Sequence, residues 1–194
     1  HETRMAVSGY RTIVEGIQFV SMQEVLKAAM VMDFGVMSVG FLRPILPILA
    51  LDVYDIGEIG LGLLGGAPAI GAVAASLTLL LVGDFKRKGV VIVLAYAGYA
   101  VAMALLGLTP WIGLALVALA VTGYMDVIAF TLKQTLIQIV APDQFRGRAA
   151  SLSSILSVTG NAAGAMEMGS LAAVFGAPGA LIINSGFALG MTGV

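Results

Sequence analysis

The chain has 194 residues, of which 59% are hydrophobic and only 11% are charged, and its formal net charge is −1. Soluble domains are about half apolar and a quarter charged, so this composition, with a mean hydropathy of +1.02, indicates a membrane protein. The chain has no cysteine, and its one histidine is the first residue. Disulfides, thiolate sites and histidine-rich zinc sites are therefore excluded, and we expect no metal, no cofactor and no enzymatic activity.

Six apolar runs follow one another along the chain. A helix needs about 20 residues to cross the hydrocarbon core, and five of the runs are long enough. Only helices and closed barrels satisfy the backbone in lipid, and the runs lack the alternation of barrel strands. We therefore predict an all-α polytopic membrane protein with six transmembrane helices in residues 26–194. The runs cover residues 26–51, 59–82, 90–108, 111 to about 132, 149–174 and 180–194.

The two ends of the chain carry separate expectations. The last run, residues 180–194, is shorter than a complete span, and the chain begins with His1 rather than methionine. Both features indicate a fragment of a longer protein. Residues 1–25 are expected to form a cytoplasmic segment, in which residues 10–20 place apolar side chains at helical spacing. This spacing predicts an amphipathic helix on the membrane surface, or equally an ordinary surface helix of a preceding loop.

Lysine and arginine predict the orientation of the chain. Apart from Arg43, they are assigned to the amino-terminal segment or to alternate connections, and Lys133 is counted among the connections. Because cytoplasmic loops are enriched in basic residues, the amino terminus and the connections at residues 83–89 and 140–148 are expected to be cytoplasmic. Membrane topology then accounts for the basic residues. The sequence has no basic patch interleaved with aromatic residues, so we do not expect nucleic-acid binding.

An internal repeat relates the two halves of the predicted bundle. At one constant offset, Met32-Asp33 recurs as Met125-Asp126, and Gly71-Ala72 recurs as Gly164-Ala165. The offset pairs helices one to three with helices four to six. An odd number of helices per repeat forces opposite orientations, as in the inverted repeats of secondary transporters. Glycines at four-residue spacing predict close helix packing, and the same surfaces would serve a moving interface. These pairs are Gly62 with Gly66, Gly160 with Gly164, and Gly186 with Gly190.

Four ionisable residues fall inside the apolar runs: Asp33, Arg43, Asp126 and Glu167. A charge at the bilayer centre costs about 2.5–3.5 kcal/mol on insertion scales, so such residues are candidates for function. At a rise of about 1.5 Å per residue, Asp33 and Asp126 are expected at one inner depth. Arg43 and Glu167 are expected near the outer ends of their spans. The inner layer is thus predicted to contain two acids, and the outer layer a base and an acid.

Each layer suggests a role for its charges. Two carboxylates facing one cavity repel each other, so at least one of Asp33 and Asp126 is expected to carry a proton, as in a proton-coupled antiporter. The alternative is that each bonds a neighbouring helix without titrating. Arg43 and Glu167 are hypothesised to pair across helices as a gate or for neutralisation, unless Glu167 reaches the outer water. Asn161, in mid-span, is expected to make an interhelical hydrogen bond or a substrate contact.

Two prolines, Pro44 and Pro47, fall within the first run. Each removes a backbone donor and clashes with the preceding turn, so a kink is predicted there. Broken helices often mark the binding sites of transporters, although a purely structural kink is equally compatible with the sequence.

Five segments carry a resemblance to a known family. They are EGIQFV (15–20), MDFGV (32–36), GDFKRKG (83–89), TLKQTLIQIVAPDQFRGR (131–148) and GNAAGAMEMGS (160–170). With these segments in this order, the chain resembles the carboxy-terminal half of the major facilitator superfamily, in particular its enterobactin-exporter-like and macrolide-efflux-like branch. Arg43 departs from the branch, which has a small or apolar residue near that point.

The resemblance implies that the six spans are helices seven to twelve of a twelve-helix carrier in the bacterial inner membrane. It implies alternating access about a cavity lined by the helices that carry Asp33 and Asp126. Proton-coupled efflux of small amphipathic molecules, such as siderophores or drugs, is the expected activity. The expected partners are the substrate, protons, membrane lipid and the missing first half. A non-transporting scaffold or sensor of the same fold is the alternative that stays open.

The resemblance also implies a cytoplasmic gate. In the family, the aspartate of the motif at residues 83–89 helps to latch the cytoplasmic side against basic groups and the start of a helix. Here Gly83 and Asp84 would face Arg146, Arg148 and the helix that begins near residue 149. The dipole at a helix amino terminus favours a carboxylate by up to about 2 kcal/mol. A solvated basic loop that only sets topology is the alternative.

Overall fold

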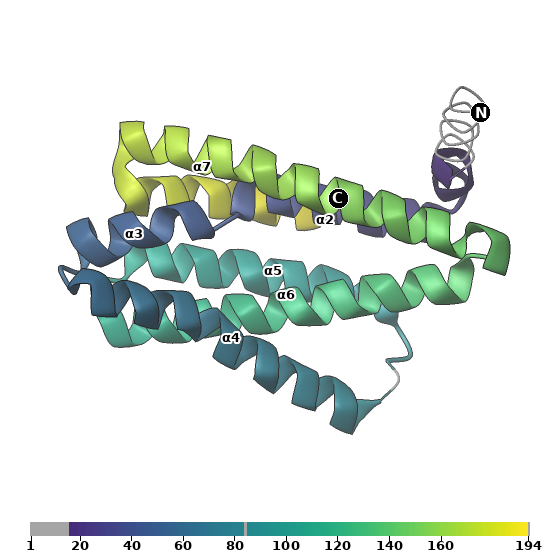
Figure 1. Ribbon diagram of the computed structural model, residues 1–194, viewed down its shortest axis with the longest axis horizontal. Coiled ribbons are helices and arrows are strands. Elements are labelled where there is room, and N and C mark those ends of the chain that lie inside the picture. The colour runs from purple at the N-terminus through teal and green to yellow at the C-terminus, as the bar shows by residue number, and fades with distance from the viewer. Residues whose placement is uncertain (1–15, 84, 194) are drawn as a thin grey trace, which may run out of the picture.

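The computed structural model describes residues 16–83 and 85–193, and within these residues the chain forms only helices and short loops (Figure 1). The all-α prediction is therefore confirmed. In chain order, the elements are a helix at residues 16–22, α2 (Glu24–Gly40), the 3₁₀ turn η1 (Arg43–Ile45), α3 (Leu46–Ile48), the π-helical turn η2 (Leu49–Val53), α4 (Gly57–Val82), α5 (Lys88–Leu108), α6 (Ile112–Val140) and α7 (Asp143–Thr192).

The long element α7 consists of two helices joined at a sharp turn. Gly176 has φ 73° and ψ 168°, a conformation that glycine adopts without a steric penalty. Pro178 follows in the first turn of the next helix, where its missing N–H costs no hydrogen bond. Residues 143–175 run to one end of the bundle, and residues 177–192 return beside them (Figure 1). The fifth and sixth spans are thus present, with a tighter connection than the sequence predicts.

Length and composition make the long helices fit to cross a membrane. The helices that qualify are Glu24–Val53, Gly57–Val82, Lys88–Leu108, Ile112–Val140 and Asp143–Thr192. Because the last of these turns at Gly176, these five helices make six long apolar segments. This arrangement agrees with the predicted six-helix membrane domain.

The first span is interrupted between α2 and η1, close to the position that the prolines predict. Phe41, directly after α2, has ψ 100°, which is extended rather than helical. Pro44 has no N–H, so it cannot bond to the Gly40 carbonyl four residues earlier. The Tyr99 hydroxyl of α5 donates to this carbonyl oxygen instead, over 2.5 Å. The break is therefore stabilised, because the released carbonyl finds a partner on another helix.

Glycines allow two close helix crossings. Gly71 of α4 lies against the backbone of Ala120 in α6, and Gly164 of α7 lies against the backbone of Met37 in α2. A β-carbon at either glycine would overlap the opposing carbonyl oxygen. The internal repeat pairs Gly71 with Gly164, and each packs on the first helix of the other repeat. Small-residue crossings of this kind support two interlocked three-helix repeats. By contrast, a β-carbon would meet nothing within 4 Å at Gly62, Gly66, Gly186 or Gly190.

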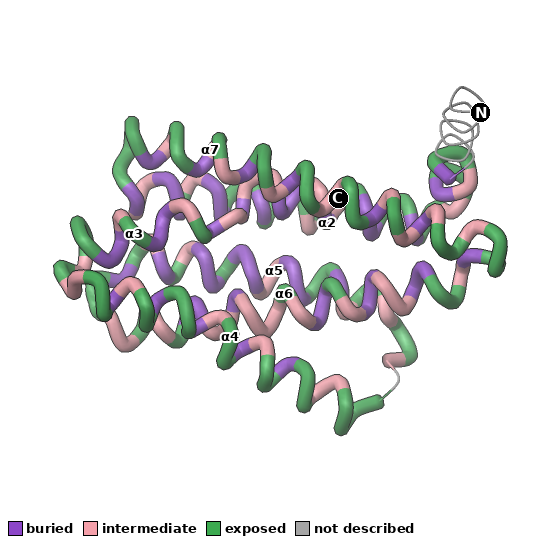
Figure 2. The backbone as a smooth tube through the Cα atoms, in the orientation of Figure 1, coloured by how far each residue is buried: buried purple, intermediate pink, exposed green. Residues whose placement is uncertain are grey.

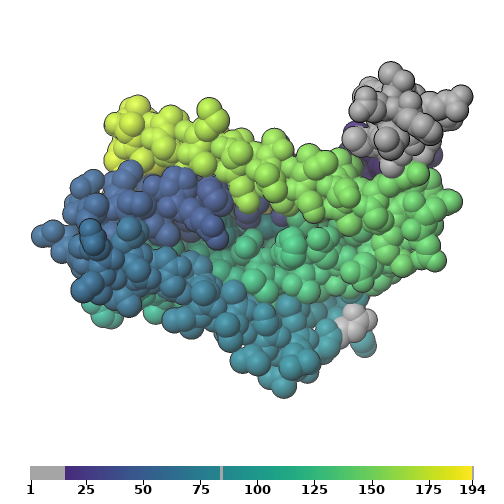
Figure 3. All heavy atoms as spheres, in the orientation of Figure 1, coloured from purple at the N-terminus to yellow at the C-terminus, as the bar shows by residue number. Residues whose placement is uncertain are grey.

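The helix α4 is the least enclosed of the long helices, as its mainly exposed and intermediate residues show (Figure 2). Its buried residues recur every three or four positions along one face, as helical geometry requires. They are Gly60, Leu64, Ala67, Gly71 and Ala75. The remaining surface exposes large apolar side chains, and its carboxy-terminal end projects from the body of the molecule (Figure 3). Such a surface is expected against lipid or another protein surface rather than against water.

The helix at residues 16–22 packs on the ends of α6 and α7. Val20 is buried there in a small apolar cluster whose other buried members are Leu26, Met30, Ile137, Ala141 and Ala149. The rings of Phe19 and Phe145 stack with their centroids 5.0 Å apart. The rest of the predicted surface helix lies outside the described residues. The division at residue 25 into two domains therefore stays a prediction.

Candidate functional site

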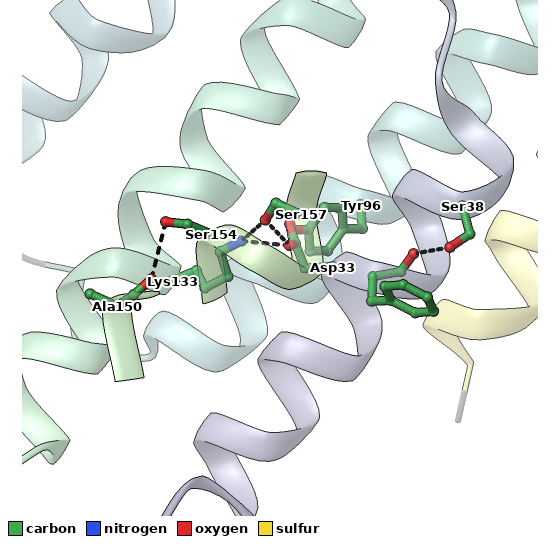
Figure 4. Close-up of polar contacts among 8 residues, drawn as sticks. Asp33, Ser38, Tyr96, Lys133, Ala150, Ser154 and Ser157 are labelled. Carbon is green, nitrogen blue, oxygen red and sulfur yellow. Dashed lines mark hydrogen bonds and ion pairs between the residues drawn. The ribbon is translucent and has the colours of Figure 1, made fainter. Parts of the chain in front are cut away.

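The Asp33 carboxylate is the centre of a buried polar cluster (Figure 4). Asp33 lies on α2 and is only 4% exposed. Its Oδ1 accepts a hydrogen bond of 2.6 Å from the Tyr96 hydroxyl of α5. Its Oδ2 accepts one of 2.6 Å from Lys133 Nζ of α6 and one of 2.7 Å from the Ser157 hydroxyl of α7. One carboxylate thus joins four helices that are distant in the sequence.

Lys133 forms a buried ion pair with Asp33. The lysine side chain is fully buried, its Nζ also donates to Ser157 Oγ over 3.1 Å, and it lies 5.4 Å from the centroid of the Phe130 ring. A charge that leaves water needs a counter-charge and hydrogen bonds to offset the desolvation penalty. The cluster supplies both, so the acid and the base can share the interior of the bundle.

Lys133 lies inside a helix and not in a connection, contrary to the prediction. The sequence predicts a connection at this lysine and an end of the fourth run near residue 132, whereas α6 continues to Val140. Leu136 and Ile137 are buried beyond the lysine, so the helix packs on both sides of the charge. The inner layer therefore contains a base as well as two acids. The apolar residues on both sides of this isolated lysine are the sequence signal that indicates a position inside a helix.

Asp126 stands apart from this cluster although it lies on the same helix as Lys133. Its side chain is exposed, and no hydrogen bond or ion pair links it to another described residue. It is nevertheless close enough for the charges of Asp33 and Lys133 to act on it. The structure therefore distinguishes the two acids of the predicted inner layer, because Asp33 is paired and enclosed while Asp126 is unpaired and accessible.

The outer layer differs from its prediction. Glu167 Oε2 accepts a hydrogen bond of 2.7 Å from Asn184 Nδ2, and no ion pair joins Glu167 to Arg43, although the structure describes both. Arg43 is exposed at the break after α2. Asn161 does not make the predicted interhelical bond through its carbonyl, because its Oδ1 is buried without a partner. The polar contact of this region thus lies between the two helices of α7.

The predicted cytoplasmic gate is only partly described. Gly83 follows the last residue of α4 as its cap, with φ 71°, and Asp84 lies outside the described residues. Arg146 pairs with Asp143 on its own helix over 2.9 Å. The Arg148 guanidinium lies 5.5 Å from the Phe145 ring centroid. These contacts place the two arginines at the start of α7, and a latch between them and Asp84 stays a prediction.

Sequence reasoning also missed Tyr96, Ser157 and Asn184 as members of polar clusters. Each is a single polar residue in an apolar helix, and nothing in its neighbours distinguishes it from an ordinary helix-packing residue. Among the described residues, no group of three or more histidine, cysteine or acidic side chains is placed to hold a metal ion.

These features define a class of protein: a polytopic helical membrane protein whose helices are joined by a buried ion pair. A family model described as "Transmembrane secretion effector" matches residues 7–193. The chain therefore belongs to this family of the major facilitator superfamily. The resemblance to the major facilitator superfamily is thus confirmed, and the relatives described next confirm the enterobactin-exporter-like branch.

Two relatives of the chain are exporters by name. The chain is 33% identical, over 152 residues, to proteins named "Enterobactin exporter EntS" from Escherichia coli O1:K1 and from Shigella boydii serotype 18. In both comparisons the match covers 78% of this chain and 36% of the relative. The chain thus spans little more than a third of the length of these relatives. No solved structure matches it.

Proposed function

We propose that this chain is the second half of a secondary active exporter that works by alternating access and is driven by protons. The family and the name of its relatives support an efflux role. Because the chain matches only 36% of those relatives, a first six-helix half is part of the proposal, as is an inner-membrane location with a cytoplasmic amino terminus. Small amphipathic molecules such as siderophores or drugs are the proposed substrates.

The observation that carries the proposal is the Asp33–Lys133 pair, held by Tyr96 and Ser157. An ionised Asp33 ties α2 to α6 by Coulomb attraction in surroundings of low dielectric constant. A protonated Asp33 would lose that attraction and keep only neutral hydrogen bonds, which are roughly half as strong as charge-assisted ones. Binding of a proton would therefore loosen the contact between the two helices that line the proposed cavity.

Asp126 is the proposed entry point for the proton or for a cationic group of the substrate. Of Asp33 and Asp126, the two acids that the repeat relates, Asp126 is the exposed one. It lies close enough to Asp33 and Lys133 to interact with their charges. An unpaired acid in a membrane span is a functional candidate by default. Arg43, Glu167 and Asn161 are proposed as further polar groups toward the outer side.

The proposed cytoplasmic gate uses Gly83 and Asp84 on one side and Arg146 and Arg148 on the other. The described contacts leave the two arginines at the amino-terminal end of α7, where the helix dipole also favours an acid. A carboxylate docked there would hold the cytoplasmic side closed and release it in the opposite state.

Proton flux in vesicles that contain the full-length protein tests the proposal. We expect substrate-dependent proton movement that Asp33→Asn and Asp126→Asn abolish. Glu58→Gln is the matched control, because Glu58 is an exposed acid in the first turn of α4. Undiminished flux in both aspartate variants would remove the coupling role. Absence of any flux from the folded wild type would favour the non-transporting scaffold instead.

A further inference from the structure

The two helices of α7 share a second polar contact, away from Asp33, in which Asn184 is buried and Glu167 is half-buried. The Asn184 side chain is 0% exposed. Its Nδ2 donates to Glu167 Oε2 over 2.7 Å and lies 3.7 Å from the sulfur of Met168. Glu167 belongs to the first helix of α7, and Asn184 belongs to the second. The contact therefore closes the hairpin that turns at Gly176.

Half of the Asn184 amide is left without a partner. Its Oδ1 is buried, and no hydrogen bond reaches it. Buried polar groups in proteins are almost always hydrogen-bonded, and leaving one unpaired in apolar surroundings is unfavourable. The orphan oxygen is an acceptor, so the group that it lacks is a donor.

An ionised Glu167 cannot supply that donor, because a carboxylate has only acceptors. A protonated Glu167 carries one O–H donor and keeps an acceptor oxygen. The carboxyl would then accept from Asn184 Nδ2 and donate to Asn184 Oδ1, so that each group donates once and accepts once. Protonation of Glu167 would therefore give Asn184 Oδ1 the hydrogen-bond donor that it lacks.

Among the described residues, no cation pairs with Glu167, and the hydrogen bond from Asn184 Nδ2 is the described polar contact of its side chain. Apart from Glu24 and Lys27 in the first turn of α2 and Lys88 at the start of α5, the ionisable side chains of the elements that pack against α7 are Asp33, Arg43, Tyr96, Tyr99, Tyr124, Asp126 and Lys133. Among the described residues, none of these forms a hydrogen bond or an ion pair with Glu167. Asp33, Tyr96 and Lys133 bond to one another, while the Tyr99 and Tyr124 hydroxyls donate to Gly40 and Thr78.

We propose that Glu167 and Asn184 form a proton-binding site, in which the amide of Asn184 holds the Glu167 carboxyl in its protonated form. The site is separate from Asp33 and joins the two last helical segments rather than the cavity-lining helices. It concerns proton binding alone, so it stands or fails independently of any transport activity.

Infrared spectroscopy of the full-length protein in lipid vesicles tests the proposal directly. We expect the carbonyl band of a protonated carboxylic acid at pH 7, which Glu167→Gln removes and the exposed control Glu58→Gln leaves in place. Glutamine offers the same donor and acceptor as the protonated acid, so this variant is expected to fold. Should it not fold, ¹³C-labelled glutamate in the wild type identifies the band by its isotope shift.

Asn184→Leu tests the part played by the amide. This change removes both hydrogen bonds, so the carboxyl band is expected to shift to higher frequency. Absence of a Glu167 carboxyl band at every pH between 5 and 8 would overturn the proposal. An unchanged band in Asn184→Leu would show that the amide does not hold the proton, and that outcome would overturn it as well.

Discussion

Lys133→Met removes the cation that the described chain pairs with the Asp33 carboxylate. The lysine is fully buried and Asp33 almost so, and Tyr96 and Ser157 remain as neutral donors. Removing one partner of a buried ion pair costs about 3–5 kcal/mol, because the other charge is left uncompensated. Insertion scales assign about 2.5–3.5 kcal/mol to a lone charge at the bilayer centre, which is the same order. We therefore expect a loss of stability of this size.

The same reasoning predicts that Asp33→Leu is about as damaging and that the double variant recovers most of the loss. With both charges replaced by apolar groups of similar volume, no uncompensated charge remains, and such replacements are often neutral. Thermal unfolding of the full-length protein in lipid nanodiscs, for the wild type and all three variants, gives the coupling energy directly. The expected coupling is several kcal/mol.

Arg146 and Asp143 provide an internal control. They form an ion pair of 2.9 Å, but their side chains are 47% and 92% exposed. Exposed pairs contribute only about 0–1 kcal/mol, so the corresponding cycle, Arg146→Met with Asp143→Leu, should show little coupling. If the Asp33–Lys133 cycle shows coupling no larger than this control, the buried pair does not tie α2 to α6.

Three further substitutions, the first with its control, test the packing that positions the site. Gly164→Leu places a side chain against the backbone of α2, and overpacking should lower the stability of the fold by at least about 1–3 kcal/mol. The control Gly62→Leu lies in open space and should leave the melting temperature unchanged. Equal melting temperatures of the two variants would contradict the close crossing at Gly164. Tyr99→Phe leaves the Gly40 carbonyl oxygen, at the break after α2, without its hydrogen-bond donor. The stability should fall by about 1–3 kcal/mol, as measured by denaturant titration. An unchanged unfolding midpoint would mean that water replaces the hydroxyl. Phe145→Ala removes the stacking partner of Phe19, a contact worth about 0.5–1.5 kcal/mol, and should speed hydrogen exchange in residues 16–22 while leaving α5 unaffected.

The spans could be predicted from the sequence because a bilayer imposes a simple rule. Every backbone group in lipid must be bonded internally, so a run of about 20 apolar residues forms a helix whatever surrounds it. The break near Pro44 was predictable for a similarly local reason, since proline lacks the donor that a helix requires. The turn at Gly176 follows equally from glycine and proline. All of these features depend on residues only a few positions apart.

Lys133 shows where local reasoning fails. A lysine at the end of an apolar run is an ordinary sign of a helix end, and its burial depends on an acid 100 residues away in the sequence. The partners Tyr96 and Ser157 carry no periodic signal of their own. The hypothesised pairing of Arg43 with Glu167 is not made in this structure, because equal depth does not put two side chains on facing surfaces.

The sequence alone therefore determined that this protein lies in a membrane, how many long apolar helical segments it has, and which ionisable residues fall inside them. Apolar run length, glycine, proline and the internal repeat carry that information, since each acts over one helix or through a simple offset. The tertiary structure decided which of these ionisable residues contact one another. It paired Asp33 with Lys133, left Asp126 exposed and joined Glu167 to Asn184. Those choices depend on how whole helices rotate and cross, and close glycine contacts between distant segments set that geometry.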